Sequence, residues 1–143
     1  MNSSKTRSLV APAGYSGKPL IEKLGIKENM TALVISPPKN FLMLLGSLPK
    51  GVAMKNRRTG LFDFIHFFTR ELSELQDEFP KLAKSLAPKG MIWISWPKGS
   101  SGIETDVSEN RIREVGLKTG LVDVKVAAID ETWSGLKFLR RKI

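Results

Sequence analysis

Short apolar runs alternate with longer amphipathic segments along this chain from Gly14 onward. That alternation is typical of strand–helix–strand units, in which buried strands read as continuous apolar runs and helices carry one apolar stripe. The pattern predicts the order α-β-α-β-β-α-β-α-β-β. The expected helices are 18–24, 41–45, 69–87 and a segment from 106 or 108 to about 118. The expected strands are 30–36, 52–54, 61–68, 91–96, 121–130 and 136–141.

Residues that favour helix ends stand next to several of these segments. Ser16, Asn40 and either Asp106 or Ser108 are expected to cap helices, and Gly25, Gly46 and Gly120 to end them. Pro80 should kink the long helix 69–87 or split it in two, because proline removes one backbone hydrogen bond. Residues 88–90, Pro-Lys-Gly, predict a stop before the next strand.

The order of elements predicts an α/β fold: a three-layer Rossmann-like sandwich with a mostly parallel sheet. The last two strands are joined by a short turn at 131–135, so we expect them to form an antiparallel hairpin at one edge. Residues 1–14 are polar and basic without periodicity and are expected to form a flexible tail. Residues 15–143 are expected to form a single domain.

Composition excludes several kinds of chemistry. The 143 residues include no cysteine and one histidine, so disulfides, thiolate metal sites, a cysteine nucleophile and a histidine-rich metal site are excluded. The net charge of +9 favours a small anionic ligand, nucleic acid or an anionic membrane, and a solvated basic surface explains it equally well. Without a long apolar run or a recognisable signal peptide, we expect a cytoplasmic protein that spans no membrane.

A ligand site is expected where the parallel strands end, because ligands of open α/β sheets bind outside the carboxyl ends of the strands. The residues that the strand predictions place at this edge are polar, basic or aromatic. The candidate ligand-binding residues are Ser36, Lys39, Arg70, Trp96, Lys98, Ser100, Ser101, Thr105, Asp106, Glu131, Thr132 and Trp133.

Two parts of this edge invite closer interpretation. The loop Lys98–Gly102 combines glycines, serines and a lysine ahead of an expected helix, which suits a phosphate or carboxylate cradle, although an ordinary exposed loop has the same composition. Trp133 is expected in a turn, where it would stack on a planar ligand or cover the cleft; the alternative is that it only covers the core. Trp93 and Trp96 should point to opposite faces of their strand, Trp93 into the core and Trp96 towards the cleft.

Familiar catalytic motifs are missing. Gly17-Lys18 is not a P-loop, since Pro12 and Pro19 stand where that motif requires glycine and Ser or Thr. His66 lies in the middle of an expected strand without a G-x-S-x-G motif, so we expect a packed residue rather than a hydrolase base. The basic clusters 55–58 and 140–142 lack the interleaved aromatic residues of a nucleic-acid site, which leaves nucleic acid as a further alternative.

Two segments resemble known families. The run 86–95, Leu-Ala-Pro-Lys-Gly-Met-Ile-Trp-Ile-Ser, resembles the L-x-P-G-G-x-L-x-x-S segment of S-adenosylmethionine-dependent methyltransferases. The glycine loop of those enzymes is absent after the first strand, where residues 36–41 read Ser-Pro-Pro-Lys-Asn-Phe, and no acidic residue follows the second strand. The resemblance therefore implies a truncated methyltransferase-like fold, and we predict no cofactor, with S-adenosylmethionine as the alternative.

A further set of blocks resembles a bacterial family of small proteins, domain of unknown function 3052. The blocks are 14–20, 95–98, 105–106 and the long segment 130–138, Asp-Glu-Thr-Trp-Ser-Gly-Leu-Lys-Phe. That resemblance implies the same methyltransferase-like core and no established activity. We therefore expect a non-catalytic domain that binds a small anionic ligand or a protein partner. The alternatives are a divergent methyltransferase and a basic nucleic-acid-binding protein.

Overall fold

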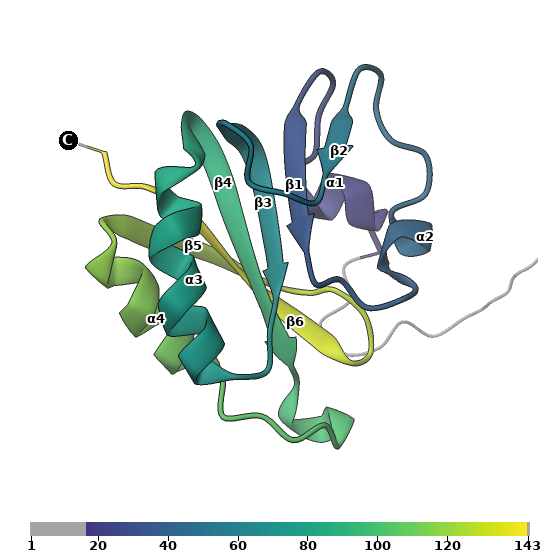
Figure 1. Ribbon diagram of the computed structural model, residues 1–143. Helices are drawn as coiled ribbons and strands as arrows, with labels where there is room; N and C mark the ends of the chain where they lie inside the picture. The colour runs from purple at the N-terminus through teal and green to yellow at the C-terminus, as the bar shows by residue number, and fades with distance from the viewer. Residues whose placement is uncertain (1–16, 143) are drawn as a thin grey trace, which may run out of the picture.

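A six-stranded mixed sheet forms the centre of the molecule in the computed structural model, which describes residues 17–142 (Figure 1). The strand order is β2-β1-β3-β4-β6-β5. The strands are β1 (Thr31–Ile35), β2 (Ala53–Lys55), β3 (Phe62–Phe68), β4 (Leu86–Pro97), β5 (Leu121–Ala128) and β6 (Trp133–Arg140). The helices are α1 (Leu20–Leu24), α2 (Phe41–Leu45), α3 (Leu72–Lys84), the 3-10 turn η1 (Gly99–Ser101) and α4 (Glu109–Lys118).

The sheet is parallel except at one side. β1 pairs in parallel with β2 and β3, and β3 pairs in parallel with β4. β6 runs antiparallel between β4 and β5, so the β5–β6 hairpin closes one edge of the sheet. The predicted order of elements, the mostly parallel sheet and the hairpin at the edge are confirmed.

Helices cover both faces and give the molecule three layers, with α3 and α4 on one side of the sheet and α1 and α2 on the other (Figure 1). Each face has its own apolar cluster because side chains alternate along the strands. Phe64 and Phe68 of β3 pack towards α1 and α2, whereas Ile65 packs towards α3 and α4. The predicted three-layer sandwich is confirmed.

The long helix is shorter than its apolar stripe suggested. α3 covers Leu72–Lys84 rather than 69–87, and it continues on both sides of Pro80, so the alternative in which Pro80 splits it in two is wrong. Phe79 and Leu82, one on each side of the proline, are completely buried, and this packing outweighs the one missing backbone hydrogen bond.

The predicted stop at 88–90 is also wrong, because these residues lie inside β4. Leu86 already pairs with Phe62, so it belongs to this strand and not to the preceding helix. Gly90 allows the close approach: a Cβ at that position would lie 2.9 Å from the Phe62 carbonyl oxygen. A strand can therefore pass through Pro88-Lys89-Gly90 at this point, next to a register shift in its partner.

The hairpin turn is tighter than predicted. β5 ends at Ala128 and β6 begins at Trp133, so Trp133 is a strand residue paired with Pro97 and not a turn residue. The Asp130 carboxylate accepts hydrogen bonds from the backbone N–H groups of Thr132 (2.8 Å) and Trp133 (2.7 Å). This side-chain bonding folds the turn within four residues, and the apolar pattern does not encode it.

The remaining differences are small. The first helix starts at Leu20 rather than at residue 18, and the second strand covers Ala53–Lys55 rather than 52–54. The second helix has the predicted bounds, 41–45. Ser108 caps α4 by accepting a hydrogen bond from the Arg111 N–H, whereas Asn40 makes no side-chain cap bond. Ser16 and the predicted tail 1–14 lie outside the described residues. Within residues 17–142, no helix has the length and apolar character needed to cross a membrane.

Candidate functional site

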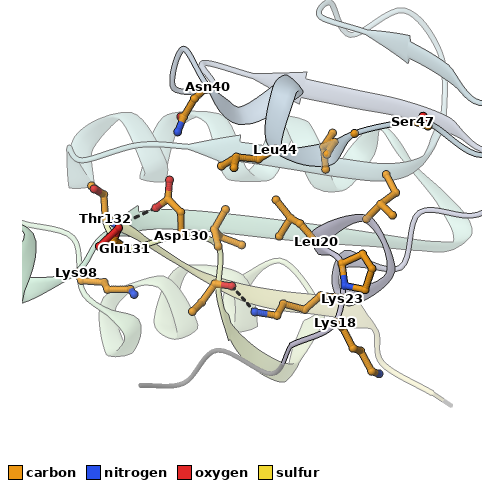
Figure 2. Close-up of a pocket in the computed structure, with 16 residues that line it drawn as sticks. Lys18, Leu20, Lys23, Asn40, Leu44, Ser47, Lys98, Asp130, Glu131 and Thr132 are labelled. Atoms are coloured by element: carbon orange, nitrogen blue, oxygen red, sulfur yellow. Dashed lines mark hydrogen bonds between the residues drawn. The ribbon is translucent and has the colours of Figure 1, made fainter. Parts of the chain in front are cut away.

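A hollow lies between α1, α2 and the β5–β6 turn, and we call it the α1–α2 hollow (Figure 2). Its volume is about 730 Å³, within the range of small-molecule sites. The apolar part of its wall includes Leu20, Leu44 and Ile129. Three lysines, Lys18, Lys23 and Lys98, contribute the positive charge.

These lysines come from two elements far apart in the sequence. Lys18 and Lys23 come from α1 and the residues before it, and Lys98 follows β4. In Figure 2 the three lie along one side of the hollow, across from Asn40 and Leu44 of the α2 side. Lys23 is only 6% exposed, and its Nζ donates a 2.9 Å hydrogen bond to the Ala128 carbonyl oxygen. Burial, followed by the nearby charges of Lys125 and Lys98, lowers the pKa of Lys23.

Two carboxylates border the same hollow, but they differ in their roles. Asp130 already accepts the two backbone hydrogen bonds that fold the hairpin turn. Glu131 is exposed at the rim. The backbone of Lys98 is held in the same region, because its N–H donates to the Thr132 carbonyl oxygen at 2.8 Å. The loop after β4 and the hairpin turn are thereby fixed to one another beside the hollow.

A second hollow of about 370 Å³ lies at the carboxyl ends of β1 and β3. The connections leave these two strands towards opposite faces of the sheet, so this is the topological switch point where α/β proteins bind ligands. Ser36, Arg70, Glu74 and Trp133 contribute to its wall. Ser36 adopts φ +57°, a left-handed conformation that is uncommon outside glycine.

The residues of the expected phosphate cradle are placed differently from the prediction. The loop 98–102 contains η1, and α4 begins only at Glu109, so no helix N-terminus adjoins the loop. Ser101 Oγ accepts a hydrogen bond from the Ile103 N–H, and Ser100 is exposed. Of this loop, Lys98 alone lines the α1–α2 hollow.

A third hollow, of about 360 Å³, includes Arg70, Thr105 and Asp106. Here two predicted ligand residues make structural contacts instead. Thr105 Oγ1 donates to the Arg70 carbonyl oxygen at 2.7 Å, and Asp106 Oδ1 accepts from the Leu72 N–H at 2.7 Å. Asp106 therefore caps α3 from a different part of the chain, rather than capping α4 as one alternative predicted.

The predicted site residues thus divide among three hollows along one edge of the sheet. Lys98, Glu131 and Thr132 line the first, Ser36, Arg70 and Trp133 the second, and Thr105 and Asp106 the third beside Arg70. Lys39 is exposed and lines none of the three. Trp96 is 9% exposed and packs in the cluster below α3 and α4, so it does not face the predicted cleft.

His66 is a packed strand residue, as predicted. The ring is completely buried and stacks on Phe68 with a centroid distance of 4.2 Å. His66 Nε2 lies 2.7 Å from Ser95 Oγ, while Nδ1 has no hydrogen-bond partner. Burial lowers the pKa of His66 to about 3, so the ring is neutral at physiological pH and does not reach a hollow where it could act as a base.

Sequence reasoning missed the α1 side of the hollow. Lys18 and Lys23 were not among the candidates because α1 precedes the first strand and does not follow a strand end. One signal was available: Lys23 stands three residues after Leu20 and beside Leu24, on the apolar stripe of the helix. A lysine in such a stripe is either extended to the solvent or held by a polar partner at the boundary of the core.

The sheet order, the helices on both faces and the terminal hairpin define a Rossmann-like fold of the methyltransferase type. A ribosomal protein L11 methylase from Lactobacillus delbrueckii subsp. bulgaricus matches with a TM-score of 0.58 and 15% identity, over 86% of this chain and 76% of that chain. A SAM-dependent methyltransferase from Aquifex aeolicus matches with a TM-score of 0.61 and 14% identity, over 90% of this chain and 91% of that one. At such identities the likeness concerns the fold alone.

Within this fold class, the chain belongs to the family described as "Protein of unknown function (DUF3052)", whose model matches residues 54–142. The match includes three of the four blocks that carried the resemblance in the sequence, and block 14–20 lies outside it. A third structure, the N-methyltransferase NodS from Bradyrhizobium japonicum WM9, has a TM-score of 0.59 and 14% identity, over 85% of this chain and 93% of that chain. No curated protein matches this chain in sequence.

Proposed function

We propose that this protein is a non-catalytic domain that binds a small anionic ligand in the α1–α2 hollow. The observation that carries the proposal is the nearly buried Lys23 at the wall of a 730 Å³ hollow that Lys18 and Lys98 also line. Three ammonium groups that line one hollow create a positive potential there, and an anion bound among them gains favourable electrostatic interactions. The apolar wall would contribute affinity through the body of the ligand.

The chemistry around the hollow supports binding without catalysis. The lone histidine is buried elsewhere and neutral, and the Asp130 carboxylate is engaged by two backbone N–H groups. General acid–base catalysis needs a titratable group within hydrogen-bond reach of the substrate. The three lysines that line the hollow suit attraction of an anion, and Glu131 is exposed at the rim. The cytoplasmic location expected from the sequence stays a prediction.

The test is thermal unfolding of the full chain with a panel of anionic metabolites, repeated with Lys98→Gln. A ligand at 100 times its dissociation constant should raise the melting temperature by about 5–10 °C for a chain of this size. Lys98→Gln should weaken that ligand at least several-fold. Lys89→Gln, which removes the same charge from an exposed position in β4, is the matched control.

Two results would contradict this function. If no anion in the panel raises the melting temperature, the proposal of a small anionic ligand is wrong. If a ligand binds the Lys98→Gln and Lys89→Gln variants with equal affinity, its site lies outside the α1–α2 hollow.

A divergent methyltransferase is the second candidate, and one observation favours it. The 370 Å³ hollow at the switch point retains a left-handed residue, Ser36, directly after β1. The fit to S-adenosylmethionine is incomplete: Pro37 offers no backbone N–H, and Lys55 and Asn56 stand where the resemblance calls for an acidic residue. Glu74 in the same hollow is a carboxylate that could accept hydrogen bonds from hydroxyl groups.

S-adenosylmethionine in the same thermal assay distinguishes the two candidates. A saturable shift that Trp133→Leu removes would favour the methyltransferase, because Trp133 lines the switch-point hollow and not the α1–α2 hollow. Absence of a shift at millimolar cofactor would eliminate it.

A further inference from the structure

One row of side chains crosses the sheet on the face that carries α1 and α2. His66 of β3 pairs with Trp93 of β4, Trp93 with Lys137 of β6, and Lys137 with Lys125 of β5. The row is aromatic in the middle of the sheet and cationic over the hairpin. Directly opposite residues in antiparallel strands have Cβ atoms about 4.5–5.5 Å apart, and like charges at such positions are destabilising.

Other lysines extend this positive region to the α1–α2 hollow. Lys23 lies near Lys125 and Lys98, whose charges, after burial, lower its pKa. Lys137 lies near Lys125 and Lys27, whose charges, again after burial, lower its pKa. A Cβ at Gly25, the residue after α1, would lie 4.0 Å from Lys137 Nζ, so Lys137 reaches the end of that helix. We call Lys23, Lys27, Lys98, Lys125 and Lys137 the lysine cluster.

Neither lysine of the sheet part of this cluster, Lys125 or Lys137, forms an ion pair within 4.0 Å among residues 17–142. Within residues 17–142, the ion pairs involve Lys81 and Arg113, which lie on α3 and α4. The segment 1–16 contains Lys5 and Arg7 and no carboxylate, so it cannot neutralise the cluster by its own charge. An anion bound from solution would supply a counter-charge to Lys125 and Lys137.

We propose that the ligand of the α1–α2 hollow is a small molecule with two or more linked phosphates, whose phosphate chain lies across the lysine cluster while its apolar or planar body occupies the hollow. This inference rests on the proposed function, since Lys23 and Lys98 belong to both the hollow and the cluster. A single phosphate would be satisfied by the hollow lysines alone. Lys125 and Lys137 line no part of the hollow and gain a role when the anionic group extends beyond it.

The experiment measures dissociation constants for AMP, ADP and ATP, coenzyme A, pyrophosphate and a 20-nucleotide oligonucleotide by calorimetry at fixed salt. The full chain is compared with the double variant Lys125→Gln/Lys137→Gln. We expect at least tenfold tighter binding of ADP or coenzyme A than of AMP. The double variant should remove most of that gain while leaving the affinity for AMP within about twofold. A double variant at Lys81 and Lys89, with the same change in charge outside the cluster, is the control.

Four other outcomes are possible, and they separate the failure of this inference from the failure of the proposed function. If AMP binds and added phosphates change nothing, the inference is wrong and the proposed function stands. If pyrophosphate alone binds as tightly as ADP, the apolar wall is not part of the site, and the inference is wrong. If only the oligonucleotide binds, with affinity that falls steeply with salt, the cluster is a nucleic-acid surface. If no probe binds, both the inference and the proposed function fail.

Discussion

His66 illustrates at the scale of one residue how burial changes chemistry. Its ring lies among Phe41, Phe64, Phe68 and Trp93, and Ser95 Oγ is its hydrogen-bond partner. Protonation would place a charge in this aromatic environment, so the folded state keeps the ring neutral and its pKa falls to about 3. The same packing that makes His66 useless as a general base makes it a source of acid sensitivity.

We predict that stability falls between pH 8 and pH 5 because of His66. The unfolded chain binds a proton near the ordinary pKa of 6.5 and the folded chain only near 3, so stability present above pH 6.5 is lost as the pH falls. The free energy of unfolding should drop by about 2 kcal/mol over this interval. Urea denaturation at several pH values measures it. His66→Phe combined with Ser95→Ala should flatten the profile, and an unchanged slope in that variant would disprove the assignment.

Gly116 shows a second constraint at the same scale. It lies in α4, and an added Cβ would lie 2.2 Å from Cε2 of Phe138, whose ring is completely buried against Phe79. Gly116→Ala gains about 1 kcal/mol of helix propensity. The clash should outweigh that gain, for a net destabilisation of about 1–2 kcal/mol. Thermal unfolding tests this prediction with Gly99→Ala as control, where an added Cβ meets nothing within 4 Å. Stabilisation by Gly116→Ala would refute it.

At the scale of the element, several predicted site residues connect one element to the next. Asp106 caps α3 across 34 positions of sequence, Thr105 bonds to Arg70, the second residue after β3, and Asp130 folds the hairpin turn. These polar residues stand at strand ends and helix starts, the positions where ligand residues are also found. Composition and position do not distinguish the two roles, because both need a short side chain with an acceptor oxygen.

Asp106→Ala should therefore lower stability rather than ligand affinity. Loss of a charged acceptor at the first turn of α3 is expected to cost about 1–2 kcal/mol, because the Leu72 N–H loses its partner near the positive end of the helix. Chemical denaturation is the measurement. Glu104→Ala, at an exposed carboxylate in the same hollow, should change stability by less than about 0.5 kcal/mol. Equal effects of the two substitutions would contradict a capping role for Asp106.

At the scale of the whole molecule, the net charge of +9 is unevenly arranged. Carboxylates gather on α3 and the segment before α4, whereas the lysine cluster lies on the hairpin, on α1 and in the loops after α1 and β4. Repulsion between like charges stabilises neither the acidic nor the basic region, and the separation produces an electric field that attracts anions to the basic face. The structure thus shows where the positive charge counted in the sequence is concentrated.

Without ligand, Lys125→Gln should stabilise the protein by about 0.5 kcal/mol, because it removes a like charge from directly opposite Lys137. In 1 M salt the gain should nearly vanish, since the Debye length falls to about 3 Å. Melting temperatures at low and high salt provide the measurement. If Lys89→Gln gives the same gain, the effect comes from net charge alone and the repulsion within the cluster is not significant.

The sequence by itself determined the order of elements, their type and much of the core, because these depend on local apolar periodicity; Trp96 and Lys23, both nearly buried, are exceptions. Trp93, His66 and the apolar run of β1 are in the core as predicted. The ends of α3, β4 and β6 were not predictable, since Leu86 and Trp133 pair with residues distant in sequence.

The tertiary structure alone decided which polar residues meet. Lys23 and Ala128 are 105 positions apart, and the register of β5 against β6 brings Lys125 opposite Lys137. It also divided one expected cleft into three hollows, because Thr105, Asp106 and Asp130 were used to join elements. Periodic patterns record which side of an element is apolar, whereas the neighbours across a sheet follow from strand order and register. Those depend on the packing of the whole chain.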